Sequence, residues 1–267
     1  MSPSNKLYCL DSKIEQVNKC CKIFLDSDDS QLSKLSQLSI YPTFLFDGFP
    51  GTGKSSVASI IYDQLKAEYN IDVARLNIDE LISHNFGESS TNLRKYFEER
   101  SKEIKENNSR CFIIMDEVDS FTINRYQNDN ESIKRILLTF NTIIDELVRS
   151  GKIYQYIIIA TTNVKESIDT SILRRFYFKE DFNIELDEAA FEIFLNELVH
   201  LTSLEIEGSS ISEMFKLYKQ KKYTLGEVKY LFSRFYVNSL ISDNTEKLNP
   251  KYFLEYQTFH EITQRQK

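Results

Sequence analysis

The sequence predicts an α/β fold in which helices cover both faces of a parallel sheet, followed by a smaller all-helical domain. Three observations predict it. From Tyr41 onward, short apolar runs alternate with longer segments in which apolar residues recur at helical spacing. The short runs are apolar throughout, as in strands that are buried on both faces. After about Asp187 the apolar stripes have helical spacing, which indicates a second, helical domain.

The elements of the first domain follow one another as alternating strands and helices. Strands are predicted at residues 43–46, 71–76, 112–115 and 156–160, and a fifth strand would begin near residues 176–178. Helices are predicted at residues 91–106 and 133–147 and from the apolar stripe Val57, Ile60, Ile61 and Leu65. Because each strand is joined to the next through a helix, the alternation favours a parallel sheet.

The two ends of the chain are predicted to be helical. Residues 1–40 would hold one amphipathic helix and then a Ser/Asp/Gln-rich stretch, which indicates a linker or a weak helix. The C-terminal part has three helical stripes and a last, aromatic-rich helix at 250–264, with Thr224 placed to cap the third helix. We therefore divide the chain into an N-terminal helix and linker (1–40), a large α/β domain (41–186) and a helical domain (187–267).

A glycine-rich loop lies between the first predicted strand and the first predicted helix. Gly48-Phe49-Pro50-Gly51-Thr52-Gly53-Lys54-Ser55 matches the phosphate-binding pattern G-x-x-x-x-G-K-[ST]. Glycines let backbone N–H groups turn toward phosphate oxygens, and the following helix adds its positive end. Lys54 would contact the β- and γ-phosphates, and Ser55 would ligate Mg²⁺. The nucleotide contacts that we expect are Gly48, Pro50, Gly51, Thr52, Gly53, Lys54, Ser55 and Ser56.

Two acidic residues, Asp116 and Glu117, follow the apolar run at 112–115. Ligands bind at the carboxyl ends of parallel strands, so both carboxylates would lie beside the glycine loop. Asp116 would hold Mg²⁺ directly or through water, and Glu117 would accept a proton from the attacking water or orient it. The alternative is an acidic turn after a buried strand, which the preceding glycine loop disfavours.

Three polar residues further along are also candidates. Asn163 follows the fourth strand, where its amide would hydrogen-bond the γ-phosphate or the attacking water, or would instead cap a turn. Arg174 and Arg175 would either pair with acids of the same chain, such as Glu180 or Asp181, or reach the nucleotide site of a neighbouring subunit and stabilise charge on the transferring phosphoryl group. The sequence leaves both alternatives open.

Composition narrows the class of protein. The chain has 267 residues, of which 41% are hydrophobic, and its net charge of −7 argues against a general nucleic-acid binder. Its four cysteines and three histidines have no zinc-ligand spacing, which indicates a reducing, cytoplasmic setting. We find no signal peptide and no apolar run long enough to span a bilayer, so membrane insertion is not expected.

These motifs, in this order, resemble the AAA family of ATPases. Walker A would be Gly48–Ser55, Walker B would be Phe112–Glu117, Asn163 would be sensor 1, and Asp169–Phe176 is similar to the arginine-finger region of the katanin, spastin and ESCRT-disassembly group. The resemblance covers roughly residues 40–235. It implies a P-loop NTPase αβα sandwich with a five-stranded parallel sheet, a small helical lid, ATP and Mg²⁺ as cofactors, and a homo-oligomeric ring, a hexamer, that remodels or disassembles a protein target.

Residues 82–89 are similar to the segment that holds pore loop 1, and the part around residues 86–89 also resembles the corresponding part of the ATPases that remodel HORMA-domain proteins. Ring translocases usually carry an aromatic residue where this chain has Asn85, and here the aromatic Phe86 comes one place later. The segment Tyr223–Glu227 resembles the start of the sensor-2 helix without its arginine. Two functions stay open: an ATP-hydrolysing remodelling motor, and an ATP-gated regulatory or assembly subunit that switches a partner protein without threading it, for example in a defence or replication complex.

Overall fold

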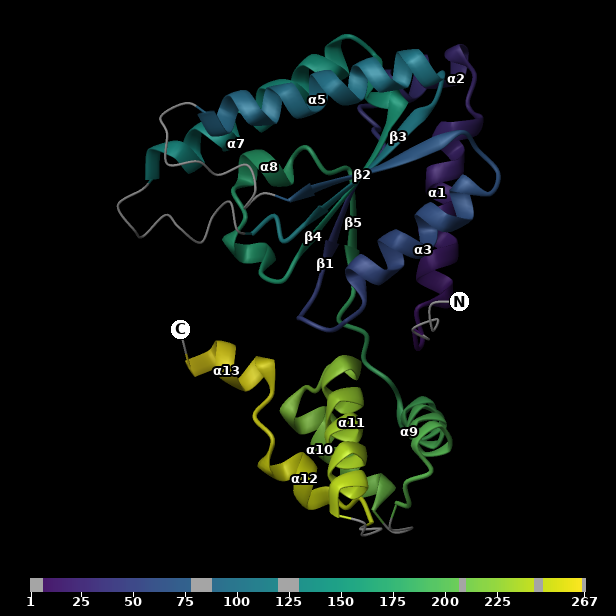
Figure 1. Cartoon of the computed structure of the whole chain (residues 1–267), viewed down its shortest axis with the longest axis vertical. Helices are drawn as coiled ribbons and strands as arrows, with labels where there is room; N and C mark the ends of the chain where they lie inside the picture. The colour runs from purple at the N-terminus through teal and green to yellow at the C-terminus, as the bar shows by residue number, and fades with distance from the viewer. Residues whose placement is uncertain (1–6, 78–87, 120–129, 207–209, 243–246, 266–267) are drawn as a thin grey trace. The chain divides into compact units, whose positions relative to one another are not determined.

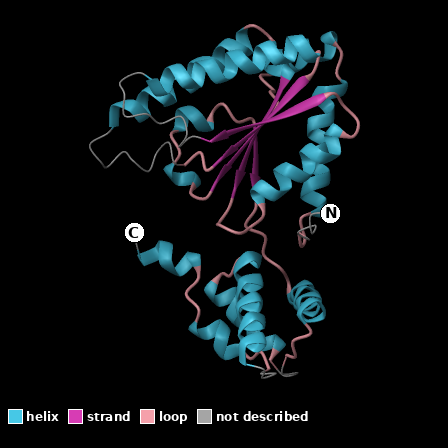
Figure 2. Cartoon of the chain, viewed as in Figure 1, coloured by secondary structure: helices cyan, strands magenta, loops and turns pink. Residues whose placement is uncertain are grey.

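The computed structural model describes residues 7–77, 88–119, 130–206, 210–242 and 247–265. The chain divides into two compact units (Figure 1). The sheet unit comprises residues 10–48 and 54–182, and the helical unit comprises residues 1–9, 49–53 and 183–267. Figure 2 shows the strands gathered in the sheet unit, whereas the described part of the helical unit consists of helices and loops.

The sheet has five strands in the order β2-β3-β4-β1-β5, and all neighbouring pairs are parallel. The strands are β1 (Thr43–Asp47), β2 (Ile71–Asn77), β3 (Arg110–Asp116), β4 (Tyr156–Thr162) and β5 (Phe178–Asp181). The predicted parallel five-stranded sheet is therefore confirmed. Because β4 lies between β3 and β1, the carboxyl ends of these three strands come together at one edge.

Burial differs between the centre and the edges of the sheet. Every residue of β4 is buried, whereas β2 exposes about half of its residues and β5 alternates between exposed and half-buried ones. The fifth strand accordingly begins at Phe178, two residues later than its apolar start suggests. Phe176 is buried, and its ring stacks on Phe140, with the ring centroids 6.5 Å apart.

Helices cover both faces of the sheet, with α1 (Asp11–Asp26) and α3 (Lys54–Lys66) on one face and α5 (Glu88–Asn107) and α7 (Asn130–Arg149) on the other (Figure 1). The helix predicted near the N-terminus packs on α3. It buries the expected stripe of Ile14, Val17, Cys21, Phe24 and Leu25. The stretch after it forms a helix, α2 (Asp29–Gln37), which buries none of its residues. The remaining elements are η2 (Lys152–Gln155), η3 (Lys165–Ser167) and α8 (Thr170–Leu173).

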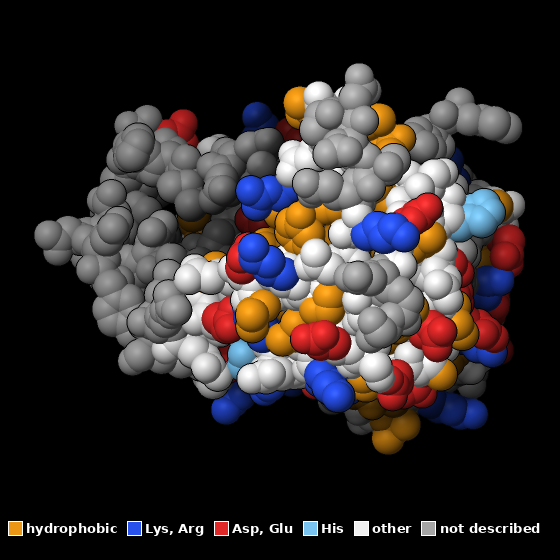
Figure 3. Space-filling view, turned by 90° about the horizontal axis from the view of Figure 1, so that it is seen from below, with side chains coloured by type: hydrophobic (Ala, Val, Ile, Leu, Met, Phe, Trp, Pro, Cys, Tyr) orange, Lys and Arg blue, Asp and Glu red, His pale blue; other side chains and the backbone are white. Residues whose placement is uncertain are grey.

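The helical unit contains α9 (Glu188–Thr202), α10 (Ile211–Lys221), α11 (Leu225–Ser242), α12 (Pro250–Glu255) and α13 (Phe259–Arg265). Its core is built from the predicted stripes, including Phe191, Phe194, Leu195, Leu198, Met214, Tyr218, Val228, Leu231, Phe232 and Phe235. On the face shown in Figure 3, basic and acidic side chains lie interspersed among apolar ones.

One helix prediction in this unit is wrong, because residues 250–264 form two helices instead of one. Thr258 is the last residue of the connection between them and directly precedes α13. Its backbone N–H donates to Glu261 Oε2 at 3.0 Å, and its hydroxyl accepts from the Glu261 N–H at 3.3 Å. This reciprocal pair is a capping box, which favours a helix start at this point over a continuous helix.

None of the helices that the structure describes combines the length and the hydropathy needed to cross a bilayer.

Candidate nucleotide site

Lys54, the first residue of α3, lies at the carboxyl edge of the sheet and is only 7% exposed. Its ammonium donates to the backbone oxygen of Gly48 and, at 3.0 Å, to Asn163 Oδ1. Gly48 in turn donates its N–H to the Thr162 oxygen at 3.3 Å, which ties the start of the glycine loop to the end of β4. The structure thus brings together three of the predicted site residues: Gly48 and Lys54 from the two ends of the glycine loop, and Asn163 from the end of β4.

Burial governs the charge of Lys54. Removal from water lowers the pKa of its ammonium to about 8, and carboxylates in the vicinity oppose this shift. These carboxylates are those of Asp47, Asp119, Glu117 and Asp116. A buried ammonium is costly unless anions or hydrogen-bond acceptors surround it. The site is therefore suited to an anionic ligand that would reach this nitrogen.

Asp116, the last residue of β3, shares one carboxylate oxygen between two hydroxyl groups. Ser55 Oγ donates to Asp116 Oδ1 at 2.6 Å, and Thr161 Oγ1 donates to the same oxygen at 3.1 Å. The other oxygen, Oδ2, lies 3.5 Å from Arg75 Nη1. The sequence analysis assigned no role to Thr161 or Arg75. A signal existed for Thr161, because it lies near the carboxyl end of β4, the strand beside β3.

Ser55 and Asp116 fit a magnesium ion by their chemistry. Both present hard oxygen atoms, and Mg²⁺ in nucleotide sites takes one or two protein oxygens and completes its shell with phosphates and water. The described residues contain no group of three or more His, Cys, Asp or Glu side chains placed to hold a metal. These residues therefore suit an ion that arrives with a phosphate ligand better than a metal held by the protein alone.

Glu117 follows β3 directly and is exposed. Its backbone is left-handed, with φ of 54°, a conformation that non-glycine residues adopt at some cost and that is common at functional sites. The turn is held by Thr161, whose hydroxyl accepts from the Glu117 N–H at 3.2 Å and whose backbone oxygen accepts from the Val118 N–H at 2.9 Å. The carboxylate is thus accessible to water on a fixed turn.

Asn163 is held at two points. Besides the contact with Lys54, its backbone N–H donates to Asp119 Oδ1 at 3.2 Å. Asp119 is 5% exposed, and its part in orienting Asn163 was not predicted. A signal existed, because Asp119 closes the same acidic run that contains Asp116 and Glu117.

Residues 49–53, the middle of the glycine loop, are described with the helical unit. Gly51 and Gly53 have positive φ angles of 78° and 93°, which glycine adopts without strain. The loop lies against the start of α11, since a Cβ atom added at Gly226 would come within 2.4 Å of the Gly51 oxygen. The remaining expected contacts are Pro50 and Thr52, which lie in the same loop, and Ser56, which is half-buried in the first turn of α3.

Arg174 and Arg175 directly follow α8, and Arg175 contacts α7 and α8. Arg175 pairs at 2.8 Å with an acid of the same chain, as one of the two alternatives predicted, but this acid is Asp145 and not Glu180 or Asp181. Glu180 instead pairs with Lys13 at 3.0 Å. Arg174 is exposed. The pore-loop prediction at residues 82–87, with Asn85 and Phe86, lies outside the described residues.

Comparison with known proteins agrees with the fold and identifies the family. The model of the AAA family, described as ATPase family associated with various cellular activities, matches residues 44–186. An uncharacterized AAA family ATPase of Sinorhizobium fredii is 32% identical over 140 residues, which are 52% of this chain and 38% of that protein. The ATPase family gene 2 protein of Saccharomyces cerevisiae is 27% identical over 199 residues, 73% of this chain and 24% of that protein.

A solved structure is similar along nearly the whole chain. One chain of the E. coli MS115-1 HORMA:CdnC:Trip13 complex superposes with a TM-score of 0.71 at 13% identity, covering 93% of this chain and 87% of that one. At 13% identity, this structural similarity is evidence for the fold alone. The chain spans less than two fifths of the length of the two curated relatives. Because the family model matches more than half of its residues and the fold agrees, the chain belongs to the AAA family of ATPases.

Proposed function

We propose that this protein binds ATP with Mg²⁺ and hydrolyses it, and that it works as a homo-oligomeric ring, a hexamer in the cytoplasm, that remodels a protein partner. One observation carries the proposal. The Lys54 ammonium, the Asn163 amide, the Ser55 hydroxyl and the Asp116 carboxylate converge at one sheet edge, through contacts of 3.0 Å between Lys54 and Asn163 and 2.6 Å between Ser55 and Asp116.

In this proposal each residue has a separate task. Lys54 leaves its contacts with Gly48 and Asn163 and binds the β- and γ-phosphates. Ser55 and Asp116 would hold Mg²⁺, and a bound Mg²⁺ would neutralise charge on the phosphates. Glu117 orients the attacking water and accepts its proton, for which its exposed position is suitable. Asn163, fixed by Asp119, then faces either Lys54 or the γ-phosphate, so its hydrogen bond depends on the nucleotide state.

The ring and the protein target rest on the family and on the structural neighbour. The neighbour was solved in a complex whose name includes a HORMA protein, which supports a protein partner for this chain as well. An arginine delivered by an adjoining copy would complete each nucleotide site, because a cation is needed where charge develops on the transferring group.

The test uses Glu117→Gln. This variant is expected to bind ATP normally and to lose about 10²–10⁴-fold in turnover, because the group that accepts the proton is gone while the phosphate contacts remain. Calorimetry with ATP and Mg²⁺ measures binding, phosphate release measures turnover, and mass measurement with ATP reports the ring. Unchanged phosphate release would remove Glu117 from this role, and the absence of nucleotide binding by the folded protein would refute the proposal as a whole.

A second candidate is an ATP-gated subunit that switches a partner without threading it. Asn85 favours it, because this residue stands where ring translocases carry an aromatic side chain. The two candidates differ in what the Glu117→Gln variant retains when it is purified with ATP. A target that stimulates turnover in the unchanged protein and is unfolded by it supports the motor, whereas a partner bound in an ATP-dependent manner without unfolding supports the switch.

A further inference from the structure

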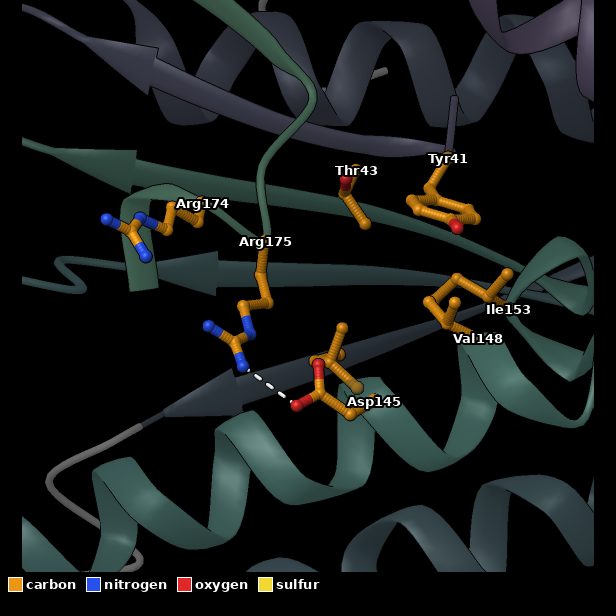
Figure 4. Close-up of a pocket in the computed structure, with 8 residues that line it drawn as sticks. Tyr41, Thr43, Asp145, Val148, Ile153, Arg174 and Arg175 are labelled. Carbon is orange, nitrogen blue, oxygen red and sulfur yellow. Dashed lines mark hydrogen bonds and ion pairs between the residues drawn. The ribbon is translucent and has the colours of Figure 1, made fainter. Parts of the chain in front are cut away.

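Arg174 and Arg175 are neighbours in sequence but have different surroundings. Arg175 donates from Nη2 to Asp145 Oδ2 at 2.8 Å and from Nη1 to the backbone oxygen of Ser171 at 2.7 Å. Arg174 is exposed, and its guanidinium forms no hydrogen bond or ion pair with any residue that the structure describes. Figure 4 shows the two side chains pointing in different directions, with Arg175 directed toward α7. One guanidinium is thus engaged within its own subunit, and the other is available.

A second contact joins the same two elements. Asn141 and Asp145 lie one turn apart on α7, and Asn141 Nδ2 donates to Ser171 Oγ at 2.9 Å. Ser171 and Arg175 are likewise four residues apart, so α7 holds the segment around α8 at two successive points. Asn141 is 8% exposed, and its partner Ser171 is half-buried, which protects this contact from competition with water.

The segment that carries Arg174 has little stability of its own. α8 has four residues, and its N-cap is Asp169, whose side chain accepts from the Ser171 N–H at 2.7 Å. A helix of one turn does not persist in isolation, because nucleation is unfavourable. The position of Arg174, which is the C-cap of α8, therefore depends on the contacts with α7.

Both arginines line a cavity of about 200 Å³, whose other walls include Tyr41, Thr43 and Val148, and within it Arg175 is the one that is hydrogen-bonded to Asp145 (Figure 4). The Arg175 side chain is 22% exposed. To reach a phosphate on another subunit, Arg175 would have to break both of its hydrogen bonds and leave Asp145 without its cation. Hydrogen bonds between charged partners are among the stronger ones in proteins, so this release is unfavourable.

We propose that the arginine pair has divided roles: Arg174 alone delivers the cation to the triphosphate of the neighbouring copy, and Arg175 is a positioning residue that, with Asp145, fixes the segment carrying Arg174. The inference rests on the proposed function, since it assigns the cation that the ring would supply. The alternative is that both arginines contact the neighbouring triphosphate in the same way. The two alternatives differ in one measurable respect, because only divided roles require Asp145 for turnover.

The test compares kcat at saturating ATP for Arg174→Ala, Arg175→Ala, Asp145→Ala and the exchanged pair Asp145→Arg with Arg175→Asp. Glu146→Ala is the matched control, because Glu146 is the adjacent carboxylate of α7 and lies 3.6 Å from Arg94 instead. We expect Arg174→Ala to lose about 10³-fold. Arg175→Ala and Asp145→Ala should each lose about 10–100-fold, because a misplaced group costs rate in this range. The exchanged pair should recover most of that loss.

The exchanged pair decides between the two roles. Recovery supports positioning, because an aspartate at 175 cannot stabilise a phosphate. A folded exchanged pair that remains as inactive as Arg175→Ala would overturn the proposal, as would an Asp145→Ala variant with normal or raised turnover. If the unchanged protein hydrolyses no ATP, the proposed function fails, and the melting temperatures of the variants then decide this inference. Equal decreases in the melting temperature of Arg175→Ala and Asp145→Ala, with recovery in the exchanged pair, support it. Independent, additive decreases refute it.

Discussion

Each unit of the molecule buries a charged side chain at the start of a helix. In the sheet unit, Lys54 is the first residue of α3 and is 7% exposed; in the helical unit, Glu227 lies in the first turn of α11 and is 2% exposed. The N-terminus of a helix carries partial positive charge, which favours a carboxylate and disfavours an ammonium. Glu227 obeys this rule and Lys54 breaks it.

The hydrogen bonds of the two residues differ in the same way. Glu227 accepts from the Thr224 N–H at 2.8 Å, from the Thr224 hydroxyl at 3.0 Å and from the Phe259 N–H at 2.6 Å, so it completes a capping box and joins α11 to the start of α13. Lys54 contacts a backbone oxygen and an amide, and burial lowers the pKa of its ammonium to about 8. Proteins break local rules mainly at functional sites, so the contrast separates a charge that stabilises the fold from one that awaits an anionic ligand.

Among the variants that test this comparison, Lys54→Met is expected to have the largest effect. Removal of the ammonium should lower kcat/KM for ATP by about 10²–10³-fold, because it removes charge stabilisation at the phosphates. The free energy of unfolding without nucleotide should stay the same or rise, since a buried cation at a helix N-terminus is lost. Phosphate release and urea denaturation measure the two quantities. A fall in stability comparable to that of a core substitution would place Lys54 with the structural charges and break the comparison.

Glu227→Ala should produce the opposite result. The Thr224 and Phe259 N–H groups would lose their acceptor inside the helical unit, and we expect the free energy of unfolding to fall by about 3 kcal/mol. Glu227→Gln, which keeps one acceptor oxygen and the same shape, serves as the control and should lose less. Urea denaturation followed by circular dichroism gives both values. Equal stability of Glu227→Ala and the unchanged protein would show that the capping contacts are dispensable.

Gly226→Ala tests the contact between the start of α11 and the glycine loop. Alanine is favoured over glycine within a helix by about 1 kcal/mol, so without a clash this change would stabilise the protein. A Cβ atom at this position would meet the Gly51 oxygen at 2.4 Å, and we expect destabilisation of about 1–3 kcal/mol together with weaker ATP binding. Calorimetric titration and thermal unfolding measure the two effects, and a rise in the melting temperature would contradict the contact.

The parts of the fold that follow from local pattern were predictable. β4 begins with an unbroken apolar run and was predicted with its correct start, whereas β5 is an edge strand in which three charged residues follow Phe178, so no apolar run marks its extent. The prediction of a single helix at 250–264 was wrong. It rested on the apolar pattern of the whole segment, whereas the helix start is set by only two residues, Thr258 and Glu261, which form the capping box.

The same distinction applies to the candidate site. Lys54, Ser55 and Asp116 were predicted because each belongs to a motif in which residue type and spacing are prescribed by phosphate and Mg²⁺ chemistry. The pairing of Arg175 with Asp145 was not, because the two residues lie 30 positions apart and only the packing of α8 on α7 brings them together. Predictions for residues 82–87 stay predictions, because these residues lie outside the part that the structure describes.

The smallest effect on turnover and stability is expected from alkylation of the cysteines. This experiment extends the comparison of the two units from charged side chains to thiols, which are uncharged when they are buried. Cys9, in the helical unit, is exposed, whereas Cys21 and Cys111 of the sheet unit are buried. Burial raises the pKa of the Cys111 thiol to about 12 and raises the pKa of Cys21 as well, so the reactive thiolate is scarce at pH 8. Mass spectrometry of the native protein should find Cys9 labelled first, with turnover and melting temperature unchanged, and Cys21 and Cys111 labelled only on unfolding. Rapid labelling of Cys21 without unfolding would mean that α1 separates from α3 in solution, and its packing on the sheet unit would then have to be revised.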